Sequence, residues 1–258
     1  MDSVDNQSKR LTFLTFLRLY MRSFFIQGSF STKYRQNVGF AFCIEPVGKQ
    51  LWNDPESRKS FLLRHLEDYN GNPFMITLVL GAVTKLEEMY RHRKGVTAQD
   101  ISQFKKAVGS ATGSVGDRFF WGTLRPFGII LGLFITLFYG VWGVLIFLLV
   151  YNIPTLALRW HWLNAGYRLG TGVVSEIQNK KIDTTIRIIG NLSAATLAFM
   201  AVVHISFFES TVSWVTGATV SVFIVSFFLL RRSLSLANVF LICIGITAVL
   251  ALIAQITM

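Results

Sequence analysis

The stretch GDRFFWGTLRP, residues 116–126, separates two parts of the chain that differ sharply in character. The sequence before it is charged and amphipathic, whereas the sequence after it is strongly apolar. The stretch combines an acid, Asp117, with two bases, Arg118 and Arg125. At helical spacing, Asp117, Trp121 and Arg125 share one face. Because charged groups beside a bilayer segment are costly unless they are paired or used, we interpret this stretch as the functional centre.

The composition is typical of an integral membrane protein. The 258 residues are 52% hydrophobic and 15% charged, against about 25% charged residues in a typical soluble domain. Eighteen of the 25 Lys and Arg and 11 of the 14 Asp and Glu lie in residues 1–126. We therefore expect an amphipathic, charged helical region over residues 1–115, associated with the membrane or a partner, and a transmembrane domain over residues 116–258. The net charge of +11 fits Lys and Arg in cytoplasmic loops, so no nucleic-acid partner is expected.

The first region is expected to form short helices over residues 11–27, 38–52, 57–69, 74–91 and 97–110. In the first, a narrow polar stripe that includes Thr15 and Arg22 is typical of a helix at an interface or on a neighbouring subunit. Pro46 is expected to interrupt the second helix. The remaining helices carry start signals: Asp54 with Pro55, Asn72, and a capping box formed by Thr97 and Asp100.

Glycine is concentrated in residues 109–143, which contain eight of the 20 glycines. Since glycine weakens a helix, either helices cross closely here or backbone breaks line a binding cavity. The apolar run over residues 119–158 is too long for one ordinary span. Gly140 and Gly143 therefore predict a helical hairpin, whose second helix Pro154 would kink or end. The segment that follows, residues 159–172, has the aromatic and basic residues of an interfacial segment.

Three further transmembrane helices are predicted over residues 186–208, 212–230 and 236–256. The positive-inside rule places the Lys180–Lys181 and Arg231–Arg232 pairs in the cytoplasm. The N-terminus is then cytoplasmic and the C-terminus outside. The polar opening MDSVDNQSKR does not resemble a signal peptide. The expected fold is an all-α integral membrane protein: amphipathic or interfacial N-terminal helices, a glycine-rich helical hairpin and about three C-terminal transmembrane helices.

Patterns for covalent or metal chemistry are missing from the sequence. Cys43 and Cys243 are far apart, and no histidine has a second ligand at metal-helix spacing. There is no phosphate-binding loop of the GxxxxGK[ST] type. We expect no metal, no cofactor and no catalytic residue. His65, beside Glu67, is interpreted as part of a solvated helix face.

Four polar groups remain as candidates for a binding site in or near the membrane, and three of them also have a simpler structural explanation. They are Glu67 with Asn70 and Asn72; Glu87 with Glu88; Asp117 with Arg118, Trp121 and Arg125; and Gln27 with Ser29 and Gln36. Asn can both donate to and accept from sugar hydroxyls, but Asn70 and Asn72 also fit a capped turn. Trp121 could provide a platform for a sugar ring, although tryptophan is also a normal interface anchor. The carboxylates at 87 and 88 could simply pair with the basic residues at 91–94.

Several blocks of the sequence, in order, resemble one family. GDRFFWGTLRP resembles the GD-x-x-FWGTLRP hallmark of the mannose/fructose/sorbose-type IID components of the bacterial phosphotransferase system (PTS). RSFFIQGSF, QNVGFAF and EP resemble the opening block of that family, RHLEDYNGNPFM its RHLEFFNTHPFM-like block, and GAVTKLEE its G-x-x-x-x-LEE. YNIPTLALRWHWLNAGYRLG matches a long downstream block.

The resemblance implies a transport role. IID components pair with an obligate IIC component, and a sugar bound between the two is translocated and then phosphorylated by IIA and IIB proteins. The implied protein is a multi-pass subunit of the bacterial inner membrane, in a higher oligomer of the IIC–IID pair, and is not itself an enzyme or phosphorylated. On this basis the expected sugar-binding residues are Glu67, Asn70, Asn72, Asp117 and Trp121. The expected site-shaping residues are Gln27, Glu87, Arg118, Gly122 and Arg125.

The chain departs from the family pattern at two of these positions. Asn72 stands where the family has His in Asn-Thr-His-Pro, and Arg118 stands where many members have Ser or Pro. A base beside Asp117 could neutralise it through an ion pair. These departures leave an alternative open, a diverged or orphan IID-like structural or regulatory subunit without transport.

Overall fold

The computed structural model describes residues 11–177 and 180–207, which are helical with no strand among them. The all-α class expected from the sequence is confirmed. The chain divides into two compact units, Met1–Ala194 and Ala195–Met258. The spans predicted at 212–230 and 236–256 lie outside the described residues. The division at residue 115 stays a prediction.

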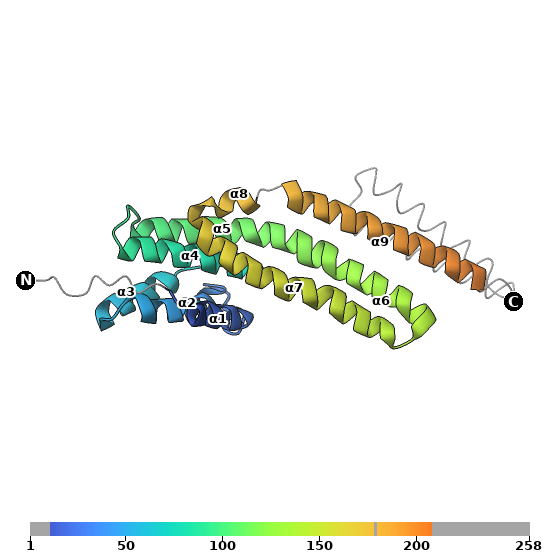
Figure 1. Cartoon of the computed structure of the whole chain (residues 1–258), viewed down its shortest axis with the longest axis horizontal. Coiled ribbons are helices and arrows are strands. Elements are labelled where there is room, and N and C mark those ends of the chain that lie inside the picture. The colour runs from blue at the N-terminus through green and yellow to red at the C-terminus, as the bar shows by residue number, and fades with distance from the viewer. Residues whose placement is uncertain (1–10, 178–179, 208–258) are drawn as a thin grey trace, which may run out of the picture. The chain divides into compact units, whose positions relative to one another are not determined.

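The N-terminal part forms three helices and a 3₁₀ turn: α1 (Phe13–Arg22), η1 (Ser23–Phe25), α2 (Asn37–Leu51) and α3 (Pro55–His65) (Figure 1). The polar stripe of α1 faces α2, where Thr15 donates to Gln50 and Arg22 pairs with Glu45 at 2.8 Å. Pro46 lies inside α2, so the predicted interruption there is wrong. The predicted start of α3 is confirmed, because the carboxylate of Asp54 accepts from the Ser57 amide at 2.7 Å.

Helix α4 (Ile76–Arg91) is almost entirely buried against the rest of the chain. It crosses α7 (Trp142–Leu169) at two glycines. A Cβ on Gly81 would lie 2.1 Å from the carbonyl oxygen of Leu163, and a Cβ on Gly166 would lie 2.2 Å from that of Leu78. Only glycine permits this approach, so α4 and α7 form the tightly packed centre of the first unit.

The predicted break in the helix after residue 110 is wrong. Helix α5 (Ala98–Gly116) begins with the Thr97–Asp100 capping box, as predicted, and runs to Gly116. It continues without a break through a π-helical segment, η2 (Asp117–Leu124), into α6 (Arg125–Tyr139). The amide of Arg125 donates to the carbonyl of Phe120, five residues back. Because π-helical turns are rare and often occur at functional sites, η2 supports the interpretation of residues 116–126 as the functional centre.

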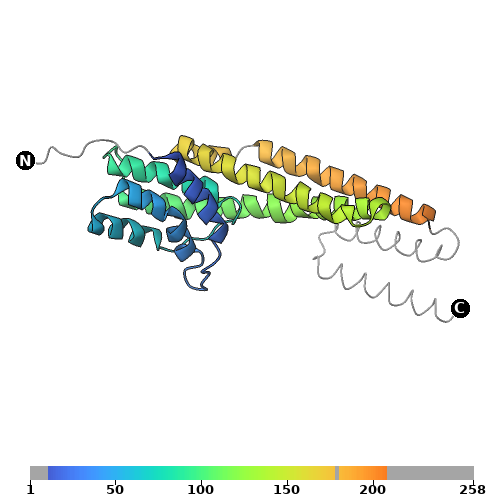
Figure 2. The ribbon, with the colours of Figure 1, turned by 60° about the horizontal axis from the view of Figure 1, so that its bottom comes forward.

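The predicted hairpin is confirmed at Gly140, which has a φ of +57° between α6 and α7. The two helices approach closely, since a Cβ on Gly143 would lie 2.2 Å from the carbonyl oxygen of Gly132. Figures 1 and 2 show α6 and α7 running side by side away from α1–α4. Among the described residues, two helical stretches are long and apolar enough to cross a membrane, Ala98–Tyr139 and Trp142–Ile177.

Helix α7 extends through most of the segment after the hairpin. Pro154 lies inside α7 and does not end it. Residues 159–172, predicted to be an interfacial segment, form the end of α7 and a short turn, η3 (Gly170–Gly172); their position at the membrane surface stays a prediction. Helices α8 (Val173–Ile177) and α9 (Lys180–Phe207) follow, and α9 covers most of the first of the three predicted C-terminal spans.

Candidate functional site

The central feature of the candidate site is the loop of residues 69–73, which connects α3 to α4 and lies along the glycines of α5. Gly109, Gly113 and Gly116 fall on one face of α5, and the loop occupies the space that side chains at positions 109 and 116 would fill. A Cβ on Gly109 would lie 2.9 Å from the carbonyl oxygen of Asn70. Gly109 and Gly116 therefore allow a loop to approach α5 closely, whereas the close helix crossing that the sequence offered as one alternative occurs at Gly132 and Gly143, between α6 and α7.

Gln36, the N-cap residue of α2, holds the same loop from the other side. Its amide group makes two bonds to one residue, donating to the carbonyl of Gly71 and accepting from its N–H, both at 3.1 Å. The backbone N–H of Gln36 also donates to the carbonyl of Tyr69 at 2.9 Å. Because both backbone groups of Gly71 are paired in a buried environment, the loop has a defined conformation.

Asn72 and Asp117 are brought together, although they are 45 residues apart. Nδ2 of Asn72 donates to Oδ1 of Asp117 at 2.9 Å. Oδ1 of Asn72 accepts from the amides of Phe74 (2.9 Å) and Met75 (3.3 Å). Asn72 therefore stabilises the turn before α4. Since the side chain is buried and bonds both to this turn and to Asp117, it orients Asp117 at the start of η2.

Asn70 and Asp117 line a half-open polar pocket of about 400 Å³ between the loop and α5. The other lining residues are Arg35, Asp68, Tyr69, Lys106, Gly109, Ser110, Gly113 and Ser114. Arg35 and Asp68 form a two-pronged pair at 3.2 and 2.6 Å, which holds the pKa of Asp68 below its usual value. Arg35 has a φ of +55°, an unusual conformation for a residue with a side chain. Carboxylate, amide, ammonium and hydroxyl groups thus meet in one cavity.

The other predicted residues of η2 lie near this pocket but do not line it. Trp121 packs on Phe74 with ring centroids 5.5 Å apart, and the guanidinium of Arg125 lies 5.2 Å from the centre of the Trp121 ring. Gly122 is exposed, and a Cβ there would meet only the carbonyl oxygen of Asp117, at 3.6 Å.

Arg118 does not pair with Asp117, contrary to the ion pair considered above. Its NH2 group lies 3.2 Å from Oδ1 of Asp183 in α9, and both side chains are exposed. The carboxylate of Asp117 instead accepts from Asn72. Asn72 and Arg118, the two residues that depart from the family pattern, therefore bond to other groups and do not fill the pocket.

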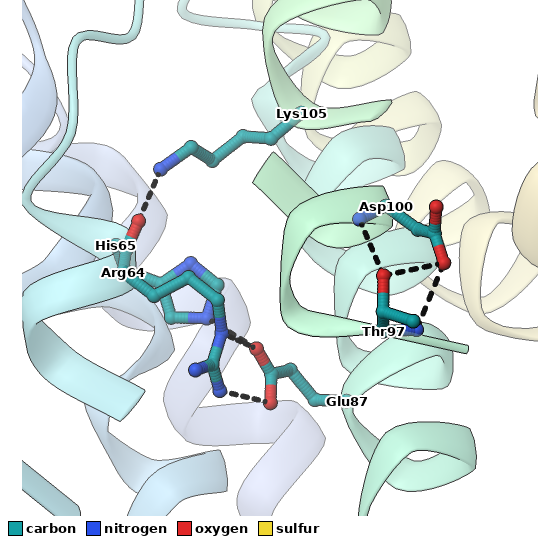
Figure 3. A network of polar contacts seen from close by, with 6 residues as sticks. All are labelled: Arg64, His65, Glu87, Thr97, Asp100 and Lys105. Atoms are coloured by element: carbon teal, nitrogen blue, oxygen red, sulfur yellow. Dashed lines mark hydrogen bonds and ion pairs between the residues drawn. The ribbon is translucent and has the colours of Figure 1, made fainter. Parts of the chain in front are cut away.

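Glu87 lies in a separate, buried polar network (Figure 3). Its carboxylate accepts two bonds of 2.8 Å from Arg64, and Nε2 of His65 lies 3.0 Å from Oε1. Nζ of Lys105 donates to the carbonyl of Arg64 at 2.9 Å. His65 is fully buried, so its expected place on a solvated face is wrong. The expected pairing of Glu87 with residues 91–94 is replaced by Arg64 and His65.

Burial and hydrogen bonding shift the pKa values of Glu87 and His65 in this network. Burial alone would raise the pKa of Glu87, but hydrogen bonds from His65 and Arg64 outweigh it and hold the pKa below its ordinary value. Burial lowers the pKa of His65 below 6.5, despite the neighbouring carboxylate. The histidine is therefore neutral, with its Nε2–H donating to Glu87. Glu87 anchors α4 to α3 and does not line the pocket of Asn70 and Asp117.

Two predicted residues lie apart from the pocket. Glu67 lines a different, shallower cavity of about 460 Å³ and lies 3.5 Å from Nζ of Lys106. Gln27 is exposed in the turn after η1. Conversely, the sequence did not point to Arg35 or Lys106 in the pocket wall. The described residues contain no group of three or more His, Cys, Asp or Glu able to hold a metal ion.

Comparison with known proteins identifies one family. The model of the "PTS system mannose/fructose/sorbose family IID component" matches residues 10–256. The chain is 30% identical over 176 residues to the fructose permease IID component of Bacillus subtilis (strain 168), covering 68% of this chain and 64% of that protein. It is 32% identical over 170 residues to the mannose-specific EIID component of Escherichia coli (strain K12), covering 66% and 60%. The matched stretch thus spans less than two thirds of the length of these relatives.

Two solved structures share the fold. One, described as a membrane protein, superposes with a TM-score of 0.73 at 23% identity, covering 93% of this chain and 97% of the other. The second is from the cryo-EM structure of the mannose transporter ManYZ with microcin E492, with a TM-score of 0.60 at 24% identity, covering 93% and 95%.

Proposed function

Because the chain belongs to the mannose/fructose/sorbose family of PTS IID components, we propose that it is the IID subunit of a permease that binds and translocates a hexose-type sugar together with a IIC subunit. The sugar is phosphorylated by IIA and IIB proteins during uptake, and this chain carries no phosphoryl group itself. The subunit crosses the bacterial inner membrane several times, with its N-terminus in the cytoplasm and its C-terminus outside.

The pocket that contains Asn70 and Asp117 is the observation that carries this proposal. Its volume falls within the range of about 300–1,000 Å³ that is usual for small-molecule sites. An amide, a carboxylate, an ammonium and serine hydroxyls can donate to and accept from the several hydroxyls of a sugar. The pocket also lies along Ala98–Tyr139, one of the two stretches able to cross a membrane, where a translocated sugar must pass.

Asn70 and Asp117 are the proposed direct sugar ligands, and Asn72 orients Asp117. Trp121, which packs on Phe74 beside Arg125, does not line the pocket, and we assign it no direct contact with a sugar bound there. The half-open shape of the pocket fits a site that a IIC subunit completes. We assign Glu87, Arg118 and Gln27 no direct contact with the sugar.

The experiment is sugar uptake in cells that express the complete IIA–IIB–IIC–IID system, with either Asn70→Ala or Asp117→Asn in this subunit. Both variants should assemble with IIC, as judged by co-purification, and lose most uptake over a panel of hexoses and amino sugars. Asp183→Asn is the matched control, because it removes an exposed carboxylate that does not line the pocket. Normal uptake by both pocket variants would exclude this site assignment.

The alternative of a IID-like subunit without transport rested on Asn72 and Arg118. Neither residue now favours it, because Asn72 supports Asp117 and Arg118 pairs with Asp183. Thermal unfolding of the purified complex with its IIC partner separates the two functions. A transport subunit gains thermal stability in the presence of its sugar, whereas a complex that no hexose or amino sugar stabilises supports the alternative.

A further inference from the structure

Arg159 is a buried cation in the middle of α7, in one of the two apolar stretches able to cross a membrane. Only 3% of its surface is exposed. None of the ion pairs between residues that the structure describes includes it. A buried charge without a counter-ion is costly, and in a membrane segment it usually marks a functional group. If this position only had to pack α7 against its neighbours, an apolar side chain would be more favourable. The contacts of Arg159 therefore need another explanation.

The guanidinium joins three parts of the fold. NH1 donates to the carbonyl of Pro73 at 2.8 Å, and NH2 donates to the hydroxyl of Ser23 in η1 at 2.7 Å. That hydroxyl in turn donates to the carbonyl of Tyr20 in α1 at 2.6 Å. The guanidinium also lies 4.4 Å from the centre of the Phe24 ring. The planar group therefore has fixed neighbours in the 69–73 loop, in α1 with η1, and in its own helix.

The bond to Pro73 matters because Pro73 ends the 69–73 loop. Asn72, which holds Asp117, is the residue immediately before it. Gln36, the N-cap residue of α2, anchors the loop at Gly71, and the loop also contacts Gly109 and Gly116 of α5. Arg159 adds an anchor from α7, at the end of the loop where Asn72 and Asp117 meet. A charge-assisted bond to this partly buried carbonyl is stronger than a neutral one, which suits it to fixing this position.

We propose that Arg159 is a positioning residue: it sets the 69–73 loop against α7 so that Asn70 and Asp117 have the spacing needed to bind sugar. The sugar part of this inference rests on the proposed function. Because α7 is also one arm of the long hairpin with α6, a shift of that hairpin reaches the loop directly through Arg159. A guanidinium serves this purpose better than an ammonium, since its two nitrogens engage Pro73 and Ser23 at once.

The first test measures the loop itself and does not need a transported sugar. Amide hydrogen exchange is followed by mass spectrometry in the purified IIC–IID complex, over the segment that contains the bonded amides of Gly71, Phe74 and Met75. Arg159→Met keeps the length of the side chain but removes every donor. We expect exchange in this segment to accelerate about 10-fold to 100-fold, as for the loss of a charge-assisted bond.

A matched control separates this effect from general damage to α7. Thr155 is buried one turn earlier in the same helix, and its hydroxyl bonds only within α7, to the carbonyl of Tyr151. Thr155→Val should leave exchange in the loop unchanged. If Arg159→Met does not assemble, Arg159→Lys keeps the charge but cannot engage Pro73 and Ser23 at once, and a smaller acceleration is expected. Unchanged loop exchange in the variant that assembles overturns the proposal.

The second test uses uptake kinetics with Arg159→Lys, Arg159→Met and Thr155→Val. Lysine keeps the charge and can reach one of the two acceptors, so the concentration of sugar at half-maximal uptake should rise less than with methionine. A purely structural residue would lower the amount of complex and the maximal rate without changing that concentration. If the wild-type complex transports no sugar, the proposed function fails, while the exchange result still decides whether Arg159 positions the loop.

Discussion

Replacing Gly116 with alanine is expected to change the stability of the protein in two opposite ways. Removing a glycine from a helix stabilises it by about 0.5–1 kcal/mol. At Gly116, however, the new Cβ would lie 2.4 Å from Cγ and 2.5 Å from Cβ of Asn72. Asn72 is buried and must move, which costs about 1–3 kcal/mol for overpacking. Its bond to Asp117 would be lost as well, at about 1.5–3 kcal/mol for a bond to a charged group.

The net expectation is a loss of about 2–4 kcal/mol in the free energy of unfolding, since the exposed Asp117 recovers part of the bond from water. Gly122→Ala is the matched control six residues on, because its Cβ meets only ordinary contact distance. Chemical unfolding of both variants in detergent micelles, followed by helical circular dichroism, measures the difference. Equal stability of the two variants would refute the idea that Gly116 is required by the close approach of Asn72.

Glu87→Gln should destabilise the protein by about 3–5 kcal/mol in the same unfolding assay, because it leaves the buried Arg64 without its counter-charge, while Glu88→Gln should cost far less. Stability should fall as the pH drops below about 6.5, since His65 has a lowered pKa in the folded state and the unfolded chain binds the proton first. Stability should fall further at acid pH as Glu87, whose pKa is also lowered, becomes protonated. A free energy of unfolding that stays constant from pH 8 to pH 5 in the wild-type protein would contradict the burial of a neutral histidine. Arg118→Ser removes only an exposed pair and should change stability by less than about 1 kcal/mol, with no change in the sugar concentration at half-maximal uptake; a large rise there would mean that Arg118 acts on the pocket.

Local signals in the sequence predicted local structure well. Asp54 with Pro55 and Thr97 with Asp100 mark helix starts that the structure confirms, because a cap depends on residues three positions apart. The hairpin at Gly140 follows from a glycine between two apolar runs. The family was also recognisable, since its hallmark at residues 116–126 is a continuous string.

Tertiary packing overrode several other signals. Pro46 and Pro154 sit inside helices that neighbouring elements hold together, although local propensity favoured interruptions. The π-helical segment at 117–124 has no local signature that distinguishes it from an α-helix. Helix periodicity placed Asp117, Trp121 and Arg125 on one face but could not show that the partner of Asp117 is Asn72.

Charge partners were the least predictable feature. Glu87 bonds to Arg64 and His65 from another helix, and Arg159 bonds to a carbonyl 86 residues away. Sequence proximity had favoured neighbours within a few residues, such as the basic residues at 91–94. Such pairings depend on how helices cross, which in this chain is decided by glycines that permit backbone contact.

The most direct test of the account is protection of the pocket by sugar. Ser114 lines the pocket and is exposed, whereas Ser175 is exposed on α8 and does not line it. Ser114→Cys and Ser175→Cys are each introduced with Cys243 replaced by serine, since the remaining Cys43 is buried. The rate of maleimide labelling is then measured in the IIC–IID complex with and without a saturating transported hexose. The account predicts that sugar slows labelling at position 114 and not at 175; equal rates at position 114 with and without sugar would contradict it.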